Sequence, residues 1–340
     1  MSIALGVPAA VAAVVVAAAV IAGIGPRMVR VADRLADLTG LGEAFVGAVL
    51  LGATTSLPDI IATVVPAVNG LPDLAVGNAL GGVLSQTAFL AVADLTYRRA
   101  NLEHAAASVP NLVQATVLIA LLGGVLALFS SPDVTLLGVH PGSLVLVAAY
   151  GFSLRLVNET TRDPMWHAVE TRETRADVPE EDEVDRSELG PLLLRFAGMA
   201  AVLAGAGFAL AIGGENLVAE AGLGEAAVGV FVTGLSSSLA ELVVSIAAIR
   251  AGALTLAVAN VIGGNTFDTL LVVVADVAYQ DGSVYAAVGP ETALVAAITI
   301  TMTAIITLGL LRRERHGVGN IGTESALVLG LYALSVLLVF

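Results

Sequence analysis

Residues 42–95 read GEAFVGAVLLGATTSLPDIIATVVPAVNGLPDLAVGNALGGVLSQTAFLAVADL, and residues 224–277 read GEAAVGVFVTGLSSSLAELVVSIAAIRAGALTLAVANVIGGNTFDTLLVVVADV. The two stretches align without a gap at a constant offset of 182, and 19 of their 54 positions are identical. A shared apolar composition does not explain why polar residues recur at matching places inside apolar stretches. The chain therefore contains a duplicated segment.

Apolar windows continue on both sides of the two copies. Hydrophobic residues make up 57% of the 340 positions, only 13% are charged, and mean hydropathy is +0.92. Stretches of about 20 apolar residues are long enough to cross a bilayer as helices. The sequence predicts an all-α membrane protein with ten transmembrane helices at 3–25, 41–67, 74–96, 108–129, 134–156, 191–214, 223–249, 253–277, 286–311 and 322–340. The first of these is too long, and lacks the basic flank, for a cleaved signal peptide.

The arginines assign a side to each predicted loop. All fifteen basic residues are arginine, and all fall in or beside the odd-numbered connections, beginning with Arg27, Arg30 and Arg34 in the first. The even-numbered connections carry acids instead: Asp73, Asp133, Glu215, Glu220 and Asp281. The positive-inside rule then predicts cytoplasmic odd loops and extracellular N- and C-termini.

This topology makes the two copies inverted. The first helix of copy one enters from the cytoplasm, whereas the first helix of copy two enters from outside. We therefore expect two inverted-topology repeats of five helices, over 1–156 and 191–340, with a substrate site near the membrane midplane. The connection 157–190 carries the acid run EEDEVD at 180–185, and we interpret it as a solvated cytoplasmic linker because it lacks the glycine pattern of a calcium loop.

Several functional classes are disfavoured by composition. The chain has no cysteine and only four scattered histidines, so we expect neither disulfides nor a zinc centre, no cofactor and no enzymatic activity. A net charge of −14 argues against nucleic acid as a partner. We expect a multi-pass protein of the cell membrane, monomeric in the lipid bilayer.

Polar residues interrupt the helices of each copy at matching places. Copy one has TTSLPD at 54–59, where Pro58 should break the helix, and copy two has SSSLAE at 236–241 without a proline. The following helices carry Gln86 and Asp268 at equivalent positions. They also carry Asn78 and Asn260, which are expected either to line a cavity or to bond between helices.

Three carboxylates thus lie near mid-membrane: Asp59, Glu241 and Asp268. Each costs at least ~2.5 kcal/mol to place there, and no arginine lies in a span core to neutralise it. They must be protonated or matched by bound cations. The nearby side-chain donors are all oxygens, from Thr55, Ser56, Ser237, Ser238 and the Gln86 amide, which suits hard ions such as Ca²⁺ and Na⁺. The alternative is a set of protonated acids that only bond helices together.

The motifs TSLPD at 55–59 and SSLAE at 237–241, each followed by an Asn and a Gly-Gly pair, resemble the α-repeats of the sodium/calcium exchanger family within the cation/calcium antiporters. The resemblance implies the ten-helix fold and four cation ligands, Asp59, Gln86, Glu241 and Asp268. It also implies hydroxyl ligands at Thr55, Ser56, Ser237 and Ser238, with carbonyl ligands near Gly52 and Gly234.

The chain departs from the family pattern at several of these positions. Asp59 stands where the family usually has glutamate, and Gln86 where it has asparagine. Gly82 and Gly264 replace serines that help to bind sodium in the family, and Ala240 replaces a proline. The three acids are still present, so the resemblance still implies a cation as the substrate. Coupling to sodium depends on the two serines that are replaced by Gly82 and Gly264.

The resulting expectation is a secondary active antiporter that exchanges Na⁺ for Ca²⁺ by alternating access, with both ions as transported substrates. The alternative is a Ca²⁺/H⁺ or Na⁺/H⁺ antiporter that uses the same acids. An intramembrane aspartyl protease would use two matched aspartates and typically a GxGD segment, which is absent. A passive channel would show simple conductance instead of saturable counter-transport.

Overall fold

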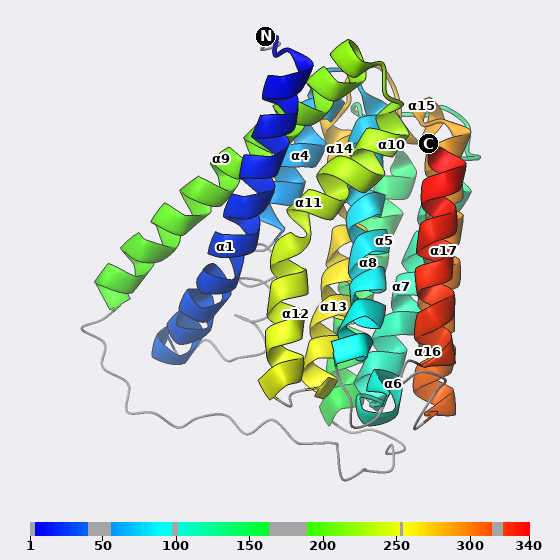
Figure 1. Cartoon of the computed structure of the whole chain (residues 1–340). Helices are drawn as coiled ribbons and strands as arrows, with labels where there is room; N and C mark the ends of the chain where they lie inside the picture. Colours follow the sequence, from blue (N-terminus) through cyan, green and yellow to red (C-terminus); the bar gives the residue numbers. More distant parts are fainter. Residues whose placement is uncertain (1–3, 40–55, 97–100, 163–188, 252–253, 315–321) are drawn as a thin grey trace.

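The computed structural model describes residues 4–39, 56–96, 101–162, 189–251, 254–314 and 322–340 (Figure 1). Within these ranges the regular structure is helical, apart from an isolated bridge between Leu136 and Val139. Thr55 and the first part of copy one, residues 42–55, lie outside the described ranges, as do residues 163–188 of the predicted linker.

The helices of the first half are α1 (Val7–Thr39), α4 (Leu57–Val68), α5 (Pro72–Thr96), α6 (Leu102–Ala105), α7 (Val109–Leu128) and α8 (Pro141–Arg162). Those of the second half are α9 (Leu189–Ala221), α10 (Glu225–Val228), a π-helix over Gly229–Gly234, α11 (Leu235–Ser237), α12 (Leu239–Ala251), α13 (Leu254–Asp268), α14 (Leu271–Ala278), α15 (Val284–Ala287), α16 (Pro290–Arg312) and α17 (Thr323–Val339).

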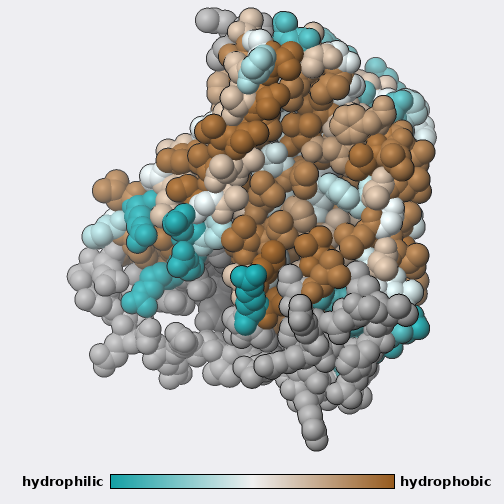
Figure 2. Space-filling model, viewed as in Figure 1, coloured by the Kyte–Doolittle hydropathy of each residue, from teal (hydrophilic) through white to brown (hydrophobic). Residues whose placement is uncertain are grey.

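Six helices in the described ranges are long and apolar enough to cross a membrane, and a bent pair over Glu225–Ser237 and Leu239–Arg250 makes a seventh. Figure 2 shows apolar side chains over most of the coloured surface along these helices, as expected for a lipid-facing exterior. The chain is therefore a multi-pass membrane protein.

Helix boundaries repeat at the offset found in the sequence. Both α1 and α9 have 33 residues, and they begin 182 positions apart. The same offset separates the starts of three further pairs: α5 and α13, α6 and α15, and α8 and α17. One matched pair lies at opposite ends of the molecule, with α6 at the lower end and α15 at the upper end (Figure 1). The duplication thus extends beyond the two copies to the flanking helices of each half.

At the lower end, Asp94 in the last turns of α5 accepts hydrogen bonds from two backbone N–H groups. One is that of Leu102 at the start of α6 (2.6 Å), and the other is that of Gly322, which precedes α17 (3.0 Å). Asp94 joins its own half to the last helix of the other half.

At the upper end, Asp276 in α14 makes the equivalent bonds. It accepts from the backbone N–H of Val284 (3.2 Å) at the start of α15 and from that of His140 (2.8 Å), which precedes α8. Every residue of this set is 182 positions from its counterpart at Asp94. Because helix N-termini leave N–H groups unpaired, one carboxylate at each end satisfies two of them and ties the halves together.

Two elements differ from the sequence expectation. The predicted first loop is wrong, because α1 continues through Arg27, Arg30 and Arg34 to Thr39. A 33-residue helix is about 50 Å long, against a hydrocarbon core of about 30 Å, so its arginine-bearing end can extend beyond the membrane. Within the predicted span 253–277, a turn at Thr269 and Leu270, directly after Asp268, separates α13 from α14, although Ala257–Ala278 still counts as one candidate span.

A helix begins next to the acid of copy one, and the chain bends next to the acid of copy two. In copy one α4 begins at Leu57, with Ser56 preceding it and Pro58 in its first turn. In copy two the chain bends by 45° between Ser237 and Leu239, although no proline is present. A π-helix precedes this bend, and the Ser237 hydroxyl lies within hydrogen-bond distance of the carbonyls of Thr233 (2.9 Å) and Gly234 (3.1 Å). Serine and the π-helix therefore distort this helix in place of proline.

The π-helix crosses α5 in backbone contact. A Cβ atom at Gly234 would lie 2.8 Å from the carbonyl oxygen of Asn78 and from the amide nitrogen of Gly82. A Cβ atom at Gly81 would lie 2.4 Å from the Cα of Val230. Only glycine allows the two segments to approach this closely, and the approach brings the middle of α5 to the break of copy two.

Candidate cation-binding site

Four segments meet at the centre of the molecule: the start of α4, the middle of α5, the bend between α11 and α12, and the end of α13. They bring together six of the side chains that the sequence singles out, all at most 3% exposed: Ser56, Asp59, Gln86, Ser237, Ser238 and Asp268. The site is thus built from both halves of the chain.

Asp268 is held by two donors from the other half. The Ser56 hydroxyl donates to Oδ1 (2.7 Å), and the Gln86 amide donates to Oδ2 (2.8 Å). The same Gln86 nitrogen lies 3.4 Å from the Ser238 hydroxyl oxygen. Ser56 and Ser238 are equivalent by the repeat, as are Gln86 and Asp268. Each serine therefore contacts the proposed ligand of the opposite copy: Ser56 contacts Asp268, and Ser238 contacts Gln86.

Asp59 has a different environment. The Ser237 hydroxyl donates to Asp59 Oδ1 in a short hydrogen bond. This hydroxyl has one proton and three oxygens within reach, so it can turn to the carbonyl of Thr233 or Gly234 and offer a lone pair instead. Ser237 can therefore either donate to Asp59 or serve as an oxygen ligand beside it.

The buried oxygens of the site lack positive partners. Asp59 Oδ2 and Gln86 Oε1 accept no hydrogen bond from any described group. The ion pairs found in the described ranges involve Arg155 and Arg312, and neither aspartate takes part in them. The charges of Asp59 and Asp268 repel each other. Acceptors that are buried without a donor cost free energy, and a cation would satisfy them.

Glu241 lies in the first turn of α12, three residues after Ser238, and is 7% exposed. Among the described residues, no three acidic or histidine side chains form a group of the size that holds a metal ion. Amide and hydroxyl oxygens are therefore needed to complete any coordination shell. Thr55, the remaining predicted ligand, lies outside the described residues.

Two glycines line the site. A Cβ atom at Gly82 would lie 3.2 Å from the Ser238 hydroxyl oxygen and 3.5 Å from Asp59 Oδ1. A Cβ atom at Gly264 would lie 3.6 Å from Gln86 Oε1. Both positions therefore face the candidate ligands, and a hydroxyl group is missing at each relative to the motif that the sequence resembles.

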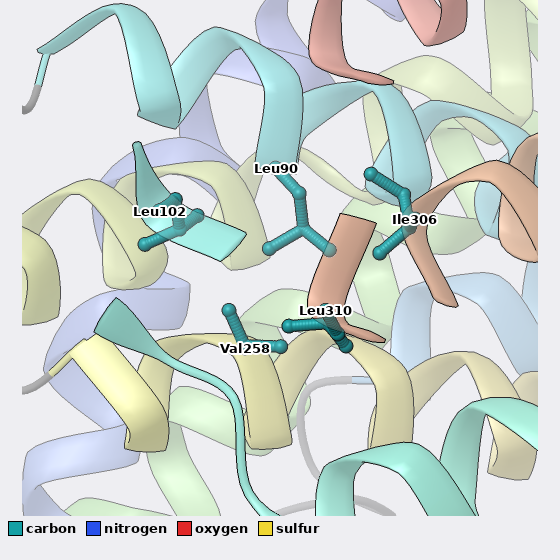
Figure 3. Close-up of a pocket in the computed structure, with 5 residues that line it drawn as sticks. All are labelled: Leu90, Leu102, Val258, Ile306 and Leu310. Carbon is teal, nitrogen blue, oxygen red and sulfur yellow. The ribbon is translucent and has the colours of Figure 1, made fainter. Parts of the chain in front are cut away.

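A separate cavity, lined only by aliphatic side chains, lies among α5, α6, α13 and α16 (Figure 3). Its lining residues are Leu90, Leu102, Val258, Ile306 and Leu310. Because these side chains offer no oxygen or nitrogen ligand, the cavity is unsuited to a cation. The polar cluster around Asp59 and Asp268 is the candidate site.

Comparison with known proteins finds one similar sequence and several similar structures. "Putative antiporter CaxA" from Alkalimonas amylolytica is 27% identical over 299 residues, which cover 84% of this chain and 86% of CaxA. The sodium-calcium exchanger NCX_Mj matches with a TM-score of 0.62 at 17% identity, over 97% of this chain and 98% of that one. The H⁺/Ca²⁺ exchanger CAX matches with a TM-score of 0.67 at 14% identity, over 96% and 82%. At these identities the two structures show a common fold.

A family model described as sodium/calcium exchanger protein matches residues 9–157 and 191–340. The match covers both halves, including Asp59, Gln86, Glu241 and Asp268, and leaves out the acidic linker between them. The chain belongs to the sodium/calcium exchanger family of the cation/calcium antiporters.

Proposed function

We propose that the protein is a secondary active antiporter that carries Ca²⁺ through the site at Asp59, Gln86, Glu241 and Asp268, with Na⁺ as the counter-ion. The observation that carries this proposal is the pair of buried aspartates from opposite halves beside oxygens that have no donor. Ser56, Ser237 and Ser238, with Thr55, supply further oxygens. Such a donor set suits Ca²⁺ and Na⁺ and offers nothing to softer metals.

Competition for one site would couple the two fluxes. If Glu241 joins Asp59 and Asp268 around the transported ion and all three acids are ionised, the empty site has a charge of about −3, so one Ca²⁺ or several Na⁺ neutralise most of it. Ca²⁺ and Na⁺ cannot occupy the site at the same time, and the protein changes between its two orientations only when one of them is bound. Exchange of unequal charge would be driven by the membrane potential, at about 2.3 kcal/mol per charge per 100 mV.

The moving elements in this proposal are α1 and α9. These two helices pack against each other at one side of the molecule (Figure 1). Each of them contacts the residue that directly precedes a proposed acidic ligand. Gly207 of α9 contacts Pro58, which precedes Asp59, and Gly25 of α1 contacts Ala240, which precedes Glu241. Sliding of this pair past α4 and α12 would open the site to one side of the membrane and then to the other.

The proposed topology has ten spans in two inverted halves of five. The arginine distribution supports cytoplasmic odd-numbered connections, including residues 157–190, and extracellular N- and C-termini. The protein would act as a monomer in the lipid bilayer, because the site takes its ligands from the two halves of one chain.

A proton is the second candidate counter-ion. The glycines at 82 and 264 favour it, because the site lacks two hydroxyl groups that would coordinate Na⁺. One of the similar solved structures is also named as an H⁺/Ca²⁺ exchanger. In this version the same acids alternate between Ca²⁺ and protons.

Flux measurements in proteoliposomes separate the counter-ions. We expect ⁴⁵Ca²⁺ uptake when an outward Na⁺ gradient is imposed at equal pH on both sides, with loss of the uptake when Na⁺ is replaced by choline. Uptake that needs a pH gradient and ignores Na⁺ would overturn Na⁺ exchange and favour the proton. A Ca²⁺ conductance that does not saturate would contradict antiport of either kind.

A further inference from the structure

Asn78, in α5, contacts the backbone of a proposed ligand residue. Its side chain is fully buried. Its Nδ2 donates to the backbone carbonyl of Asp59 (3.2 Å) and to the hydroxyl of Thr63 (3.1 Å), both in α4. Its Oδ1 is buried without a hydrogen-bond partner among the described residues. The side chain therefore binds α4 through its nitrogen and leaves its oxygen free.

Asn78 belongs to the face of α5 that lines the site. Gly82 and Gln86 follow it at intervals of four residues, which places all three on one side of the helix. The Gly82 position faces Asp59 Oδ1, and Gln86 donates to Asp268. Asn78 thus extends the site by one turn.

The backbone of Asn78 packs closely against the π-helix. A Cβ atom at Gly229 would lie 3.0 Å from its amide nitrogen, and one at Gly234 would lie 2.8 Å from its carbonyl oxygen. Asp59, by contrast, lies in the first turn of a short helix that begins at Leu57. The bond from Asn78 ties the carbonyl of Asp59 to α5, in a turn whose first N–H groups have no partner inside the helix.

The equivalent asparagine of copy two has a different environment. Asn260 in α13 is exposed, and none of the hydrogen bonds found in the described ranges involves its side chain. The repeat alone predicts equal roles for Asn78 and Asn260, whereas the contacts separate them. Asn260 is therefore a matched control in the same protein.

We propose that Asn78 is a positioning residue that fixes the carboxylate of Asp59 through its backbone carbonyl and so sets the size of ion that the site accepts. This inference rests on the proposed transport of divalent cations at Asp59. Removal of a group that orients a metal ligand typically costs about 10- to 100-fold in affinity. The loss should depend on ionic radius, because a displaced carboxylate suits a larger ion better than a smaller one.

The test compares Asn78→Ala with Asn260→Ala in proteoliposomes, with Ca²⁺ and the larger Sr²⁺ as alternative substrates. We expect Asn78→Ala to raise the KM for Ca²⁺ about tenfold and the KM for Sr²⁺ at least threefold less, and Asn260→Ala to leave both unchanged. Asn78→Ser, which retains a hydroxyl donor, should fall between wild type and Asn78→Ala. Binding of ⁴⁵Ca²⁺ to the purified protein provides a second measurement that does not depend on turnover.

The outcomes separate this inference from the proposed function. A lower maximal rate with an unchanged ratio of KM values would show that Asn78 only supports folding, and would overturn the positioning role. Equal effects of Asn78→Ala and Asn260→Ala would also overturn it, while antiport at the site would stand. A wild-type protein that neither binds nor carries Ca²⁺ would overturn both.

Discussion

Gln86 and Asp268 occupy the same position in the two copies and lie in direct contact. The amide of Gln86 donates to the carboxylate of Asp268, and such charge-assisted bonds are stronger than those between neutral groups. The bond orients the amide so that Oε1 is the atom left to face a cation. Copy one therefore contributes a neutral ligand where copy two contributes an anion.

The counter-ion depends on residue 82. Gly82→Ser would add a hydroxyl oxygen next to Ser238 and Asp59, where the Ser238 side chain can rotate to accommodate it. If Na⁺ competes with Ca²⁺ at this site, the added ligand should strengthen Na⁺ binding. We expect the Na⁺ concentration that halves ⁴⁵Ca²⁺ uptake to fall by about threefold, which corresponds to less than 1 kcal/mol.

Gly123→Ser is the control for this substitution, because a Cβ atom at Gly123 meets no atom within 4 Å. It should leave inhibition by Na⁺ unchanged. The same inhibition curve for Gly82→Ser and Gly123→Ser would mean that the Gly82 position does not face a bound Na⁺.

The sequence alone singled out most residues of the buried polar cluster but not how they pair. Ser56, Asp59, Gln86, Ser237, Ser238 and Asp268 were all predicted, because polar residues in apolar helices stand out. The partners across the two halves could not be predicted, since they depend on how the start of α4 and the bend at Ser238 pack against α13 and α5. The bond from Asn78 to a backbone carbonyl has no sequence signal beyond the recurrence of asparagine in both copies.

At the scale of helices, the proposed movement depends on close contact between α9 and α4. A Cβ atom at Gly207 would lie 2.7 Å from the carbonyl oxygen of Pro58 and 2.8 Å from its Cα. Backbone atoms cannot move aside as side chains do, so Gly207→Ala must push α9 away from the helix that carries Asp59. We expect the maximal rate of ⁴⁵Ca²⁺ exchange to fall by about tenfold or more.

Gly205 provides a control on the same helix, since a Cβ atom there meets no atom within 4 Å. Gly205→Ala should insert normally and retain its exchange rate, with a small gain in helix stability of up to about 1 kcal/mol. Equal rates for the two variants, at equal amounts of inserted protein, would argue against a tight contact between α9 and α4 during transport.

Helix breaks were only partly predictable. Pro58 predicted a helix break in copy one; α4 begins at Leu57, and the residues that precede Ser56 lie outside the described ranges. The 45° bend of copy two has no proline and depends on a π-helix, for which sequence patterns give little indication. The arginines after residue 25 suggested a loop, yet α1 continues, because a charged helix outside the membrane needs no break.

At the scale of the whole molecule, one offset of 182 relates the helices, the site and the two carboxylate ties at Asp94 and Asp276. The offset was visible in residues 42–95 and 224–277, where polar residues recur. Its extension to α1 and α9, or to α8 and α17, was hidden because these helices share little beyond apolar character. Only their boundaries and the bonds at Gly322 and His140 reveal it.

Asp268 of one half accepts hydrogen bonds from Ser56 and Gln86 of the other half. Loss of the Asp268 carboxylate should therefore abolish exchange without unfolding the protein. The most direct measurement is ⁴⁵Ca²⁺ uptake by proteoliposomes that contain Asp268→Asn or Glu241→Gln, with Asp281→Asn as a control at an exposed loop acid. We expect both site variants to lose at least about 99% of uptake, equivalent to about 2.7 kcal/mol or more, while Asp281→Asn remains near wild type. Normal uptake by both site variants, with normal insertion, would contradict a cation site at the junction of the two halves.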